Sequence, residues 1–370
     1  MKKVTLLRSR ITDSNVFKIA EALSERYEVT LIIWNRSLER IKNNLKYKLY
    51  LFNFKAPYDN VKVLIFLPFW LVYQCIMLVK TNPDIIHSFD LDTLLPAIFY
   101  KTIKSKKIVY TILDFYSDTL INVPRFVKNI FSLLEKSLIR FCDAVIIVDP
   151  SRYFQIKGAS IKKIGIIYNT PPDIIGVNQL LLHQQIKKNK EFVIFYAGNL
   201  HRERNLIRVI KAVLTLDNTR FIIAGRGELE NIIIKLAKKF GEKITYLGYI
   251  TYDEVLRRSL SADVLIAFYD PSIPNNLYAS PNKFFEAMML GKPIITNDGT
   301  LLAKNVKRFG IGLVVPYDDV NAIRNAFLLL RDNPTLAFSF GLKGRKIYEK
   351  LFSWDKIKER LFSIYENLYN

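Results

Sequence analysis

The chain has 370 residues, half of them hydrophobic and 24% charged, which allows two globular domains and excludes an intrinsically disordered protein. The net charge of +21 favours an anionic partner: a nucleotide, a nucleic acid or an acidic membrane surface. Two cysteines, Cys75 and Cys142, lie in apolar runs and argue against a disulfide framework or a zinc site. Met1-Lys2-Lys3 leads straight into a strand without a signal peptide, so we expect the chain to stay in a reducing cytoplasm.

The first half reads as alternating buried strands and helices. We expect a strand at Val4–Leu7, a helix at Val16–Arg26 and a second strand at Val29–Trp34. This spacing predicts a doubly wound unit with a parallel sheet, whose ligands lie beyond the carboxyl ends of the strands. The loop after the first strand contains Arg8 and Arg10. They either supply positive charge to a ligand or are solvated loop residues.

The run Val63–Val79 contains no charged residue. It is shorter than the ~20 residues that span a bilayer, and Pro68 and Gln74 interrupt it. We expect a helix that packs on the sheet. The alternative is a helix that dips into one membrane leaflet, with Trp70 and Tyr73 at the interface.

Two polar residues stand at predicted strand ends in the first half. His87 follows Ile85-Ile86 and is the ready neutral-pH acid or base of this half, although a histidine there can also simply bond the backbone. Asp114 ends the next strand and is alternatively a helix cap. Further on, Arg125 and Lys128 form a basic stretch suited to lipid or substrate phosphate.

Pro171-Pro172 is a stiff break, so we expect domains at residues 1–171 and 172–350, followed by a C-terminal helix within 351–370. The second half restarts with a strand at Phe192–Ala197 and a loop that contains Gly198 and Arg204. Gly198 lets the backbone approach a ligand closely, and an arginine can grip a diphosphate through two parallel N–H bonds. The alternative is an ordinary turn with exposed charges.

The next two predicted strands also end in turns. Gly225 and Gly227 follow the strand at Phe221–Ala224. Leu247 and Tyr249 follow the strand that starts at Ile244. A tyrosine here can stack on a nucleotide base, although packing is the commoner role.

A short predicted helix at Lys283–Leu290 begins after a polar loop and precedes a buried strand at Ile294-Ile295. We expect Ser280 to cap it, Pro281 to fit its first turn and Gly291 to end it. The N-terminus of a helix is suited to an anion because its N–H groups and its dipole both favour negative charge.

This stretch resembles the nucleotide-sugar site of GT-B glycosyltransferases, in particular the retaining family 4 of the group 1 type. The family pattern reads roughly Pro-x-Lys-x-x-Glu-x-x-x-x-Gly-x-Pro, and the matching residues are Pro281, Lys283, Glu286, Gly291 and Pro293. The loop from Gly198 resembles the family's Gly-x-Leu-x-x-x-Lys loop, with Arg204 at the lysine position. Many relatives carry a second glutamate at position 278, where this chain has Tyr278, so the resemblance leaves the donor sugar open.

The resemblance implies an α/β GT-B fold: two doubly wound, Rossmann-like domains facing a cleft, with a C-terminal helix that crosses back to the first domain. Arg204 and Lys283 would neutralise the leaving diphosphate, and Glu286 would hold the ribose. His87 and Asp114 would orient the acceptor and the sugar. The implied donor-binding residues are Gly198, Asn199, Arg204, Gly225, Gly227, Leu247, Tyr249, Ser280, Pro281, Asn282, Lys283 and Glu286.

The implied activity is retaining transfer of a sugar from a nucleotide diphosphate sugar to a glycan or lipid-linked acceptor. We expect no metal or other cofactor, no nucleic-acid partner, and a peripheral location at the cytoplasmic face of an anionic membrane. Three alternatives stay open: a non-catalytic nucleotide-sugar-binding protein, a nucleotide-sugar epimerase, and a nucleic-acid binder. The last rests on charge alone, since no recognition module is evident.

Overall fold

The computed structural model describes residues 1–11, 14–38, 45–57, 63, 65–119, 123–175 and 191–369. The chain divides into two compact units. Unit 1 comprises Met1–Tyr168 together with Ile357–Asn370, and unit 2 comprises Asn169–Lys356. The sequence placed the corresponding divisions after residue 171 and before residue 351.

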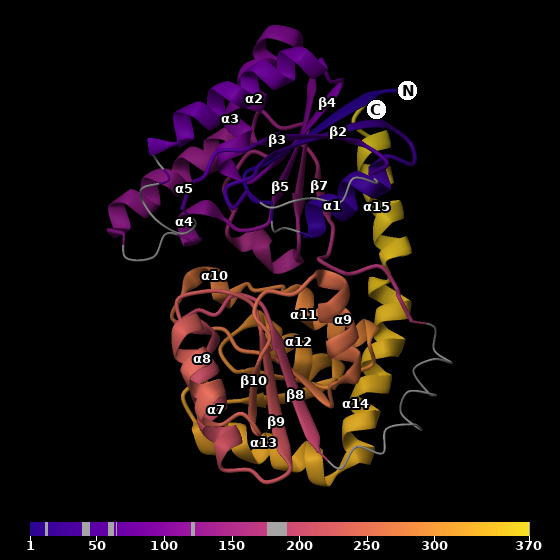
Figure 1. Cartoon of the computed structure of the whole chain (residues 1–370). Coiled ribbons are helices and arrows are strands. Elements are labelled where there is room, and N and C mark those ends of the chain that lie inside the picture. The colour runs from indigo at the N-terminus through magenta and orange to yellow at the C-terminus, as the bar shows by residue number, and fades with distance from the viewer. Residues whose placement is uncertain are drawn as a thin grey trace. The chain divides into compact units, whose positions relative to one another are not determined.

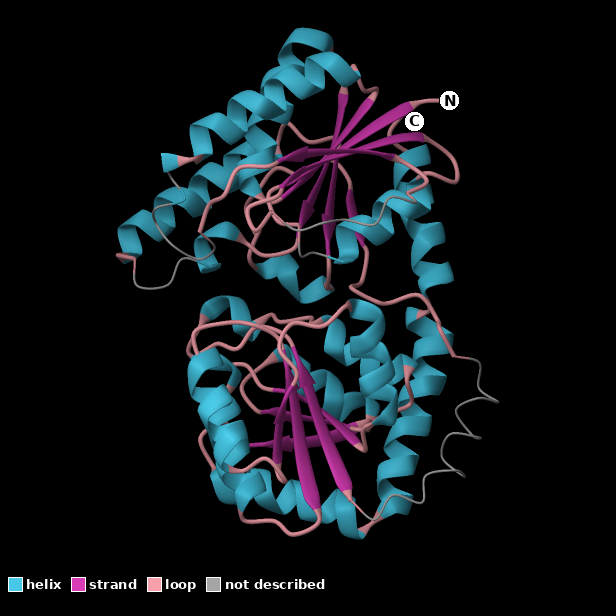
Figure 2. Ribbon diagram, in the orientation of Figure 1, coloured by secondary structure: helices cyan, strands magenta, loops and turns pink. Residues whose placement is uncertain are grey.

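Unit 1 is built on a parallel sheet, seven-stranded within the described residues, in the order β3-β2-β1-β4-β5-β6-β7 (Figure 2). From β1 the chain moves outward to β3 and then returns to pair β4 with the other side of β1. The edge between β1 and β4 is therefore the topological switch point, where doubly wound folds bind ligands. The strands are β1 Lys3–Arg8, β2 Glu28–Trp34, β3 Lys48–Phe52, β4 Ile85–Phe89, β5 Lys107–Ile112, β6 Ala144–Ile147 and β7 Ile164–Ile166.

Helices cover both faces of this sheet (Figure 1). The helices α2, α3 and α5 lie on one face, and α1 and the last helix, α15, lie on the other. The bounds are α1 Ser14–Leu23, α2 Leu67–Thr81, α3 Leu91–Lys104, α4 Tyr116–Thr119, α5 Arg125–Ile139, the 3-10 turn η2 Pro150–Phe154, and α15 Trp354–Glu366.

The helix α15 joins unit 1 through contacts far apart in sequence. Arg26 lies 2.7 Å from Glu366 and Lys358 lies 3.1 Å from Glu25, both as ion pairs. The C-terminal helix thus packs in the first unit, as the sequence predicted.

The apolar run Val63–Val79 forms most of α2, with residue 64 outside the described residues. Trp70 is fully buried and stacks on Trp34 with ring centroids 5.7 Å apart, so the expectation of a helix packed on the sheet is confirmed. Trp70 and Tyr73 contact each other and face this aromatic core, so the alternative that put them at a membrane interface was wrong. Within the described residues, no helix combines the length and the apolarity needed to cross a bilayer.

Unit 2 repeats the same plan with a parallel sheet that, among the described residues, has six strands in the order β10-β9-β8-β11-β12-β13. Its switch point lies between β8 and β11. The strands are β8 Phe192–Ala197, β9 Thr219–Ala224, β10 Ile244–Tyr246, β11 Val264–Ala267, β12 Ile294–Asn297 and β13 Gly312–Val315. The helices are η3 Arg202–Arg204, α7 Leu206–Leu214, α8 Glu230–Lys239, α9 Tyr252–Ser261, α10 Pro274–Leu277, α11 Asn282–Met289, α12 Leu301–Phe309, α13 Val320–Asp332, α14 Pro334–Ile347 and the π-helical turn η4 Tyr348–Phe352. These two parallel sheets confirm the predicted pair of doubly wound domains.

Candidate functional site

The loops after β8 and β9 meet backbone to backbone at the carboxyl edge of the unit 2 sheet. Gly225 has a φ of +131°, and a Cβ on it would lie 1.8 Å from the carbonyl oxygen of Gly198. A Cβ on Gly198 would lie 2.7 Å from Nζ of Lys283. No side chain fits between these loops, so the glycines allow the Lys283 ammonium to lie directly on the backbone of the first loop.

Arg204 lies at the end of the η3 turn in that first loop. Its guanidinium carbon lies 4.2 Å from the centroid of the Tyr269 ring, and one of its nitrogens donates to the Asn276 amide oxygen at 3.4 Å. Tyr269 follows β11 and Asn276 lies in α10, so residues from across the switch point orient this arginine. Stacking on an aromatic face holds a guanidinium in one plane while leaving its edges for an anion.

Lys283 lies in the first turn of α11 and is half-buried. Its ammonium lies 4.8 Å from the centroid of the Tyr196 ring. Burial, with a smaller contribution from the positive charge of Arg204, lowers the pKa of Lys283 to about 8, against an opposing effect of Glu286. A cation in this position is destabilised until an anion joins it.

Arg204 and Lys283 are therefore brought together. Arg204 acts electrostatically on both Lys283 and Tyr196, and Tyr196 is the ring beneath the Lys283 ammonium. Tyr196 is buried, and its hydroxyl donates to the carbonyl oxygen of Asn199 at 2.7 Å. Two cations and a helix N-terminus converge at the carboxyl edge of one sheet, which is an anion site by its chemistry.

The start of α11 differs from the prediction. The N-cap is Pro281, which has no side chain able to accept a bond, and Ser280 does not cap the helix. Ser280 is buried, and its carbonyl oxygen accepts a hydrogen bond from the Asn169 amide at 3.1 Å. Asn282 is half-buried in the first turn of the helix. Gly291 follows the helix with a φ of +60°, as predicted.

Glu286 lies one turn further along α11 and is buried. Its carboxylate accepts a hydrogen bond from the Tyr252 hydroxyl at 3.0 Å. The side chain thus lies in the same helix as Lys283 and has a neighbouring hydroxyl that fixes its orientation.

The remaining donor-side candidates surround this centre. Gly227 and Asn199 lie in the loops after β9 and β8, and Asn199 is exposed. The Leu247 N–H donates to the carbonyl oxygen of Ile223 at 2.9 Å, so this N–H is not available to a nucleotide base. Tyr249 is exposed over half of its surface, and the Arg226 guanidinium lies 5.2 Å from its ring centroid.

Comparison with known proteins identifies this arrangement. Residues 178–347 match the family model described as glycosyl transferases group 1. Residues 178–347, within unit 2, thus carry a group 1 glycosyltransferase domain, and the chain has the GT-B fold.

Several relatives have glycosyltransferase names, and the solved structures share the fold. A GDP-mannose-dependent monoacylated alpha-(1-6)-phosphatidylinositol monomannoside mannosyltransferase of Corynebacterium glutamicum is 24% identical over 216 residues, 57% of this chain and 51% of that one. The chain thus spans about half the length of that relative. The GalNAc-alpha-(1->4)-GalNAc-alpha-(1->3)-diNAcBac-PP-undecaprenol alpha-1,4-N-acetyl-D-galactosaminyltransferase of Campylobacter jejuni is 24% identical over 89% of this chain and 88% of that one. The structure of sucrose-phosphate synthase from Thermosynechococcus elongatus superimposes with a TM-score of 0.80 at 17% identity, covering 100% of this chain and 99% of that one.

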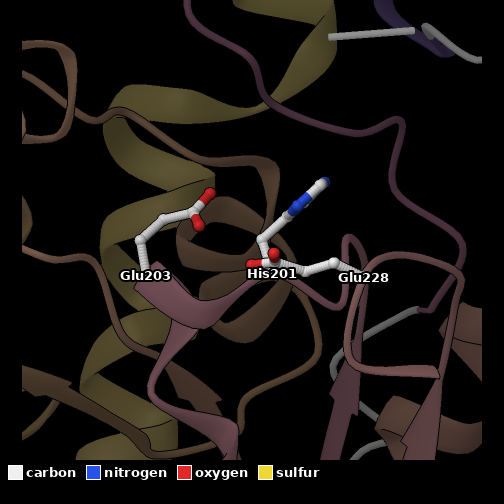
Figure 3. A group of neighbouring side chains, drawn as sticks. All are labelled: His201, Glu203 and Glu228. Carbon is white, nitrogen blue, oxygen red and sulfur yellow. The ribbon is translucent and has the colours of Figure 1, made fainter. Parts of the chain in front are cut away.

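The loops after β8 and β9 also bring together three side chains of types that bind metals, drawn in Figure 3. Ligand atoms of His201, Glu203 and Glu228 lie within 4.8 Å of one another. Both carboxylates already have a basic partner: Glu228 lies 3.7 Å from the Arg202 guanidinium, and Glu203 lies 3.9 Å from that of Arg204. These contacts already stabilise the negative charge of both carboxylates.

The residues of unit 1 that the sequence predicted for the site include one, His87, that lies in the core. His87 lies within β4 and is completely buried, with its ring stacked on Phe89. One ring nitrogen bonds the Thr111 hydroxyl at 2.6 Å and the other bonds the Tyr365 hydroxyl of α15 at 2.7 Å. Burial lowers the pKa of His87 to about 3. The predicted role of His87 in orienting the acceptor was therefore wrong for this structure, because the side chain faces α15 inside the core.

Asp114 and Arg8 lie at the carboxyl edge of the unit 1 sheet. Asp114 is half-exposed and pairs with Arg152 at 3.3 Å. Arg8, the last residue of β1, is buried and pairs with Asp90 directly after β4. Arg8 is thus not a solvated loop residue, and this ion pair occupies the switch point of the first sheet.

Sequence reasoning missed the two tyrosines that hold the cations, Tyr196 and Tyr269. Both are aromatic residues at or just after the end of a buried strand, Tyr196 in β8 and Tyr269 beyond β11. Both positions could have been predicted from the sequence, because each tyrosine lies at the end of a strand whose loop is expected to bind phosphate.

Proposed function

We propose that this group 1 glycosyltransferase transfers a sugar from a nucleotide diphosphate sugar to a glycan or lipid-linked acceptor, with retention of anomeric configuration. The convergence of Arg204 and Lys283 carries the proposal. As the bond between sugar and diphosphate breaks, negative charge grows on the diphosphate. Two preorganised cations beside the N-terminus of α11 stabilise that charge more in the transition state than in the ground state.

Glu286 would hold the ribose of the donor, because a buried carboxylate accepts hydrogen bonds from paired hydroxyls. Tyr252 fixes its orientation through the 3.0 Å bond. Tyr249 and the turn around Leu247 would lie against the base. The mannosyltransferase relative is named as GDP-mannose-dependent, which supports a nucleotide-sugar donor of this general kind.

The acceptor proposal rests on two relatives. The names of both include a lipid, a phosphatidylinositol mannoside in one and undecaprenol in the other. A lipid-linked acceptor would place the enzyme at the cytoplasmic face of a membrane, and the net charge of +21 suits an anionic surface. Asp114 is half-exposed at the carboxyl edge of the first sheet, which supports a contact between its carboxylate and an acceptor hydroxyl. No metal takes part in this proposal, since Arg204 and Lys283 supply the positive charge.

One departure favours a second candidate, a protein that binds nucleotide sugars without turning them over. Tyr278 stands where many relatives have a glutamate that touches the donor sugar. Thermal-shift screening with UDP, GDP and ADP sugars would identify the donor. Incubation of that donor, radiolabelled in the sugar, with membrane lipid extract then separates the functions. Labelled lipid supports transfer, whereas binding without product supports the second candidate, and a changed sugar on the nucleotide indicates an epimerase.

A further inference from the structure

The outer side of α2 carries a continuous apolar stripe. Its members follow one another at intervals of four and three residues, which places them on one helical face. They are between 58% and 68% exposed: Ile65, just before the helix, and Phe69, Val72, Ile76 and Val79. The opposite side of the helix buries Trp70, Gln74, Met77 and Leu78 in unit 1. The helix thus has a distinct buried side, and the residues of the apolar stripe are exposed although they are apolar.

The neighbouring helices continue this stripe. The helix α2 contacts α3 and α3 contacts α5, and the three lie side by side on the sheet (Figure 1). The exposed apolar residues of α3 are Leu95, Phe99 and Ile103, and those of α5 are Phe126, Ile130, Leu133 and Leu134. We call these residues, together with the stripe on α2, the apolar face. Scattered exposed apolar residues are normal, but three adjacent helices with such stripes indicate an interaction surface.

The charges on these three helices have one sign wherever they reach solvent. Lys80, Lys104 and Arg125 are exposed. The acidic residues of the helices are Asp92 and Glu135, and both turn inward: Asp92 bonds Ser9, and Glu135 is completely buried with its carboxylate bonded to the Tyr110 hydroxyl at 2.7 Å. Among the described residues of these three helices, the exposed charges are thus all positive.

We propose that the apolar face docks onto the surface of a membrane that contains anionic lipids. Apolar side chains would enter the acyl boundary while lysines and arginines contact the headgroups. A second copy of this chain is a poorer occupant, because two such faces brought together by symmetry would oppose their positive charges. The inference rests on the proposed function only for its setting, a lipid-linked acceptor, and vesicle binding can be measured without any sugar transfer.

The test uses the full chain and vesicles in a flotation assay. We expect binding to vesicles of phosphatidylglycerol and phosphatidylcholine, and much weaker binding to phosphatidylcholine alone. A triple variant, Phe69→Asp, Ile76→Asp and Phe99→Asp, should lower the partition into anionic vesicles by roughly tenfold or more. A matched double variant on unit 2, Ile232→Asp and Leu329→Asp, replaces residues that are 43% and 42% exposed and should bind as the unaltered chain does.

Two further measurements, of the circular dichroism spectrum and of the donor-induced thermal shift, test whether the variants stay folded. All these side chains are exposed, so the variants should keep the circular dichroism spectrum and the thermal shift produced by the nucleotide-sugar donor. If the triple variant floats as well as the unaltered chain, or if the unaltered chain fails to bind anionic vesicles, the proposal is overturned. A chain that ignores vesicles but changes from dimer to monomer in the triple variant would instead show that the face is a self-association surface. If the unaltered chain binds anionic vesicles but turns over no donor, the result counts against the proposed function and not against docking.

Discussion

The ammonium of Lys283 lies 4.8 Å from the centroid of the Tyr196 ring, and a Cβ on Gly198 would come within 2.7 Å of it. The side chain is thus held between an aromatic ring and a glycine backbone, close to Arg204. An aromatic ring stabilises a cation without neutralising it. The positive charge is therefore retained for an incoming diphosphate.

Removing either cation should abolish most of the turnover without unfolding the protein. We expect Arg204→Ala and Lys283→Ala each to lower kcat/KM for the donor by about 10²- to 10³-fold, the usual cost of losing one charge-stabilising group. Lys304→Ala replaces an exposed lysine on α12 and serves as the control. Steady-state kinetics with the identified donor measures the effect. Turnover that survives in either variant would remove that residue from the diphosphate site.

Donor affinity should weaken above pH 8. In the free protein the pKa of Lys283 is lowered to about 8, so its positive charge is present below that pH and is lost as the pH rises through it. The diphosphate of a nucleotide sugar does not titrate in this range, and its binding favours the charged lysine. Kd should therefore rise by up to about tenfold per pH unit above 8. Calorimetric titrations from pH 6.5 to 9.5 measure it, and Lys283→Arg should give a flat profile.

The same residues show how far the sequence could predict the site. The loop–helix–strand pattern gave the helix around Lys283, its end at Gly291 and the position of Arg204, because these depend on local propensity and on short spacing. The Ser280 cap was wrong because Pro281 takes the N-cap position. Tyr196 and Tyr269 were missed because their roles depend on residues brought close only by folding.

The role predicted for His87 was wrong, and the choice between packing and membrane contact for Trp70 was left open, for a related reason. His87 looks like a strand-end residue, but its partner Tyr365 is 278 positions away in sequence, on a helix that packs against that side of the sheet. Trp70 lies in a helix with apolar residues on every side, so the spacing of apolar residues cannot show which side of the helix packs on the sheet. The strands β3 and β7 and the helices α12 and α14 were not anticipated either.

Acidification should destabilise the protein partly through His87. Burial lowers its pKa to about 3, against about 6.5 in the unfolded chain, so the unfolded state binds more protons below pH 6.5. The stability that the neutral ring contributes is lost progressively as the pH falls from about 6.5 towards 3. His87→Phe should cost about 1–3 kcal/mol at pH 7, since it leaves two hydroxyls without their partner, yet it should show a smaller drop in thermal midpoint between pH 7 and pH 5. Thr111→Val, which keeps the ring, is the control and should retain the full drop.

Turnover should not depend on a divalent metal. The carboxylates of Glu203 and Glu228 lie beside Arg204 and Arg202, which stabilise their negative charge. We expect unchanged rates in EDTA and after His201→Ala, which removes one of the three ligand types in the cluster. A rate that collapses in EDTA, returns with Mn²⁺ or Mg²⁺, and is absent in His201→Ala would assign a metal to this cluster instead.

Glu286 should recognise the ribose of the donor. Its carboxylate is buried and already bonded to the Tyr252 hydroxyl, so it can add hydrogen bonds to sugar hydroxyls without reorganising. The unaltered enzyme should therefore prefer the ribonucleotide donor over its 2′-deoxy analogue by about tenfold, the cost of one lost charged hydrogen bond. Glu286→Gln should shrink that preference, because a neutral amide accepts more weakly. Tyr252→Phe keeps the carboxylate but frees its orientation, so it should lower affinity for both donors while retaining the preference. If Glu286→Gln weakens both donors equally, the carboxylate does not touch the hydroxyl that the analogue lacks.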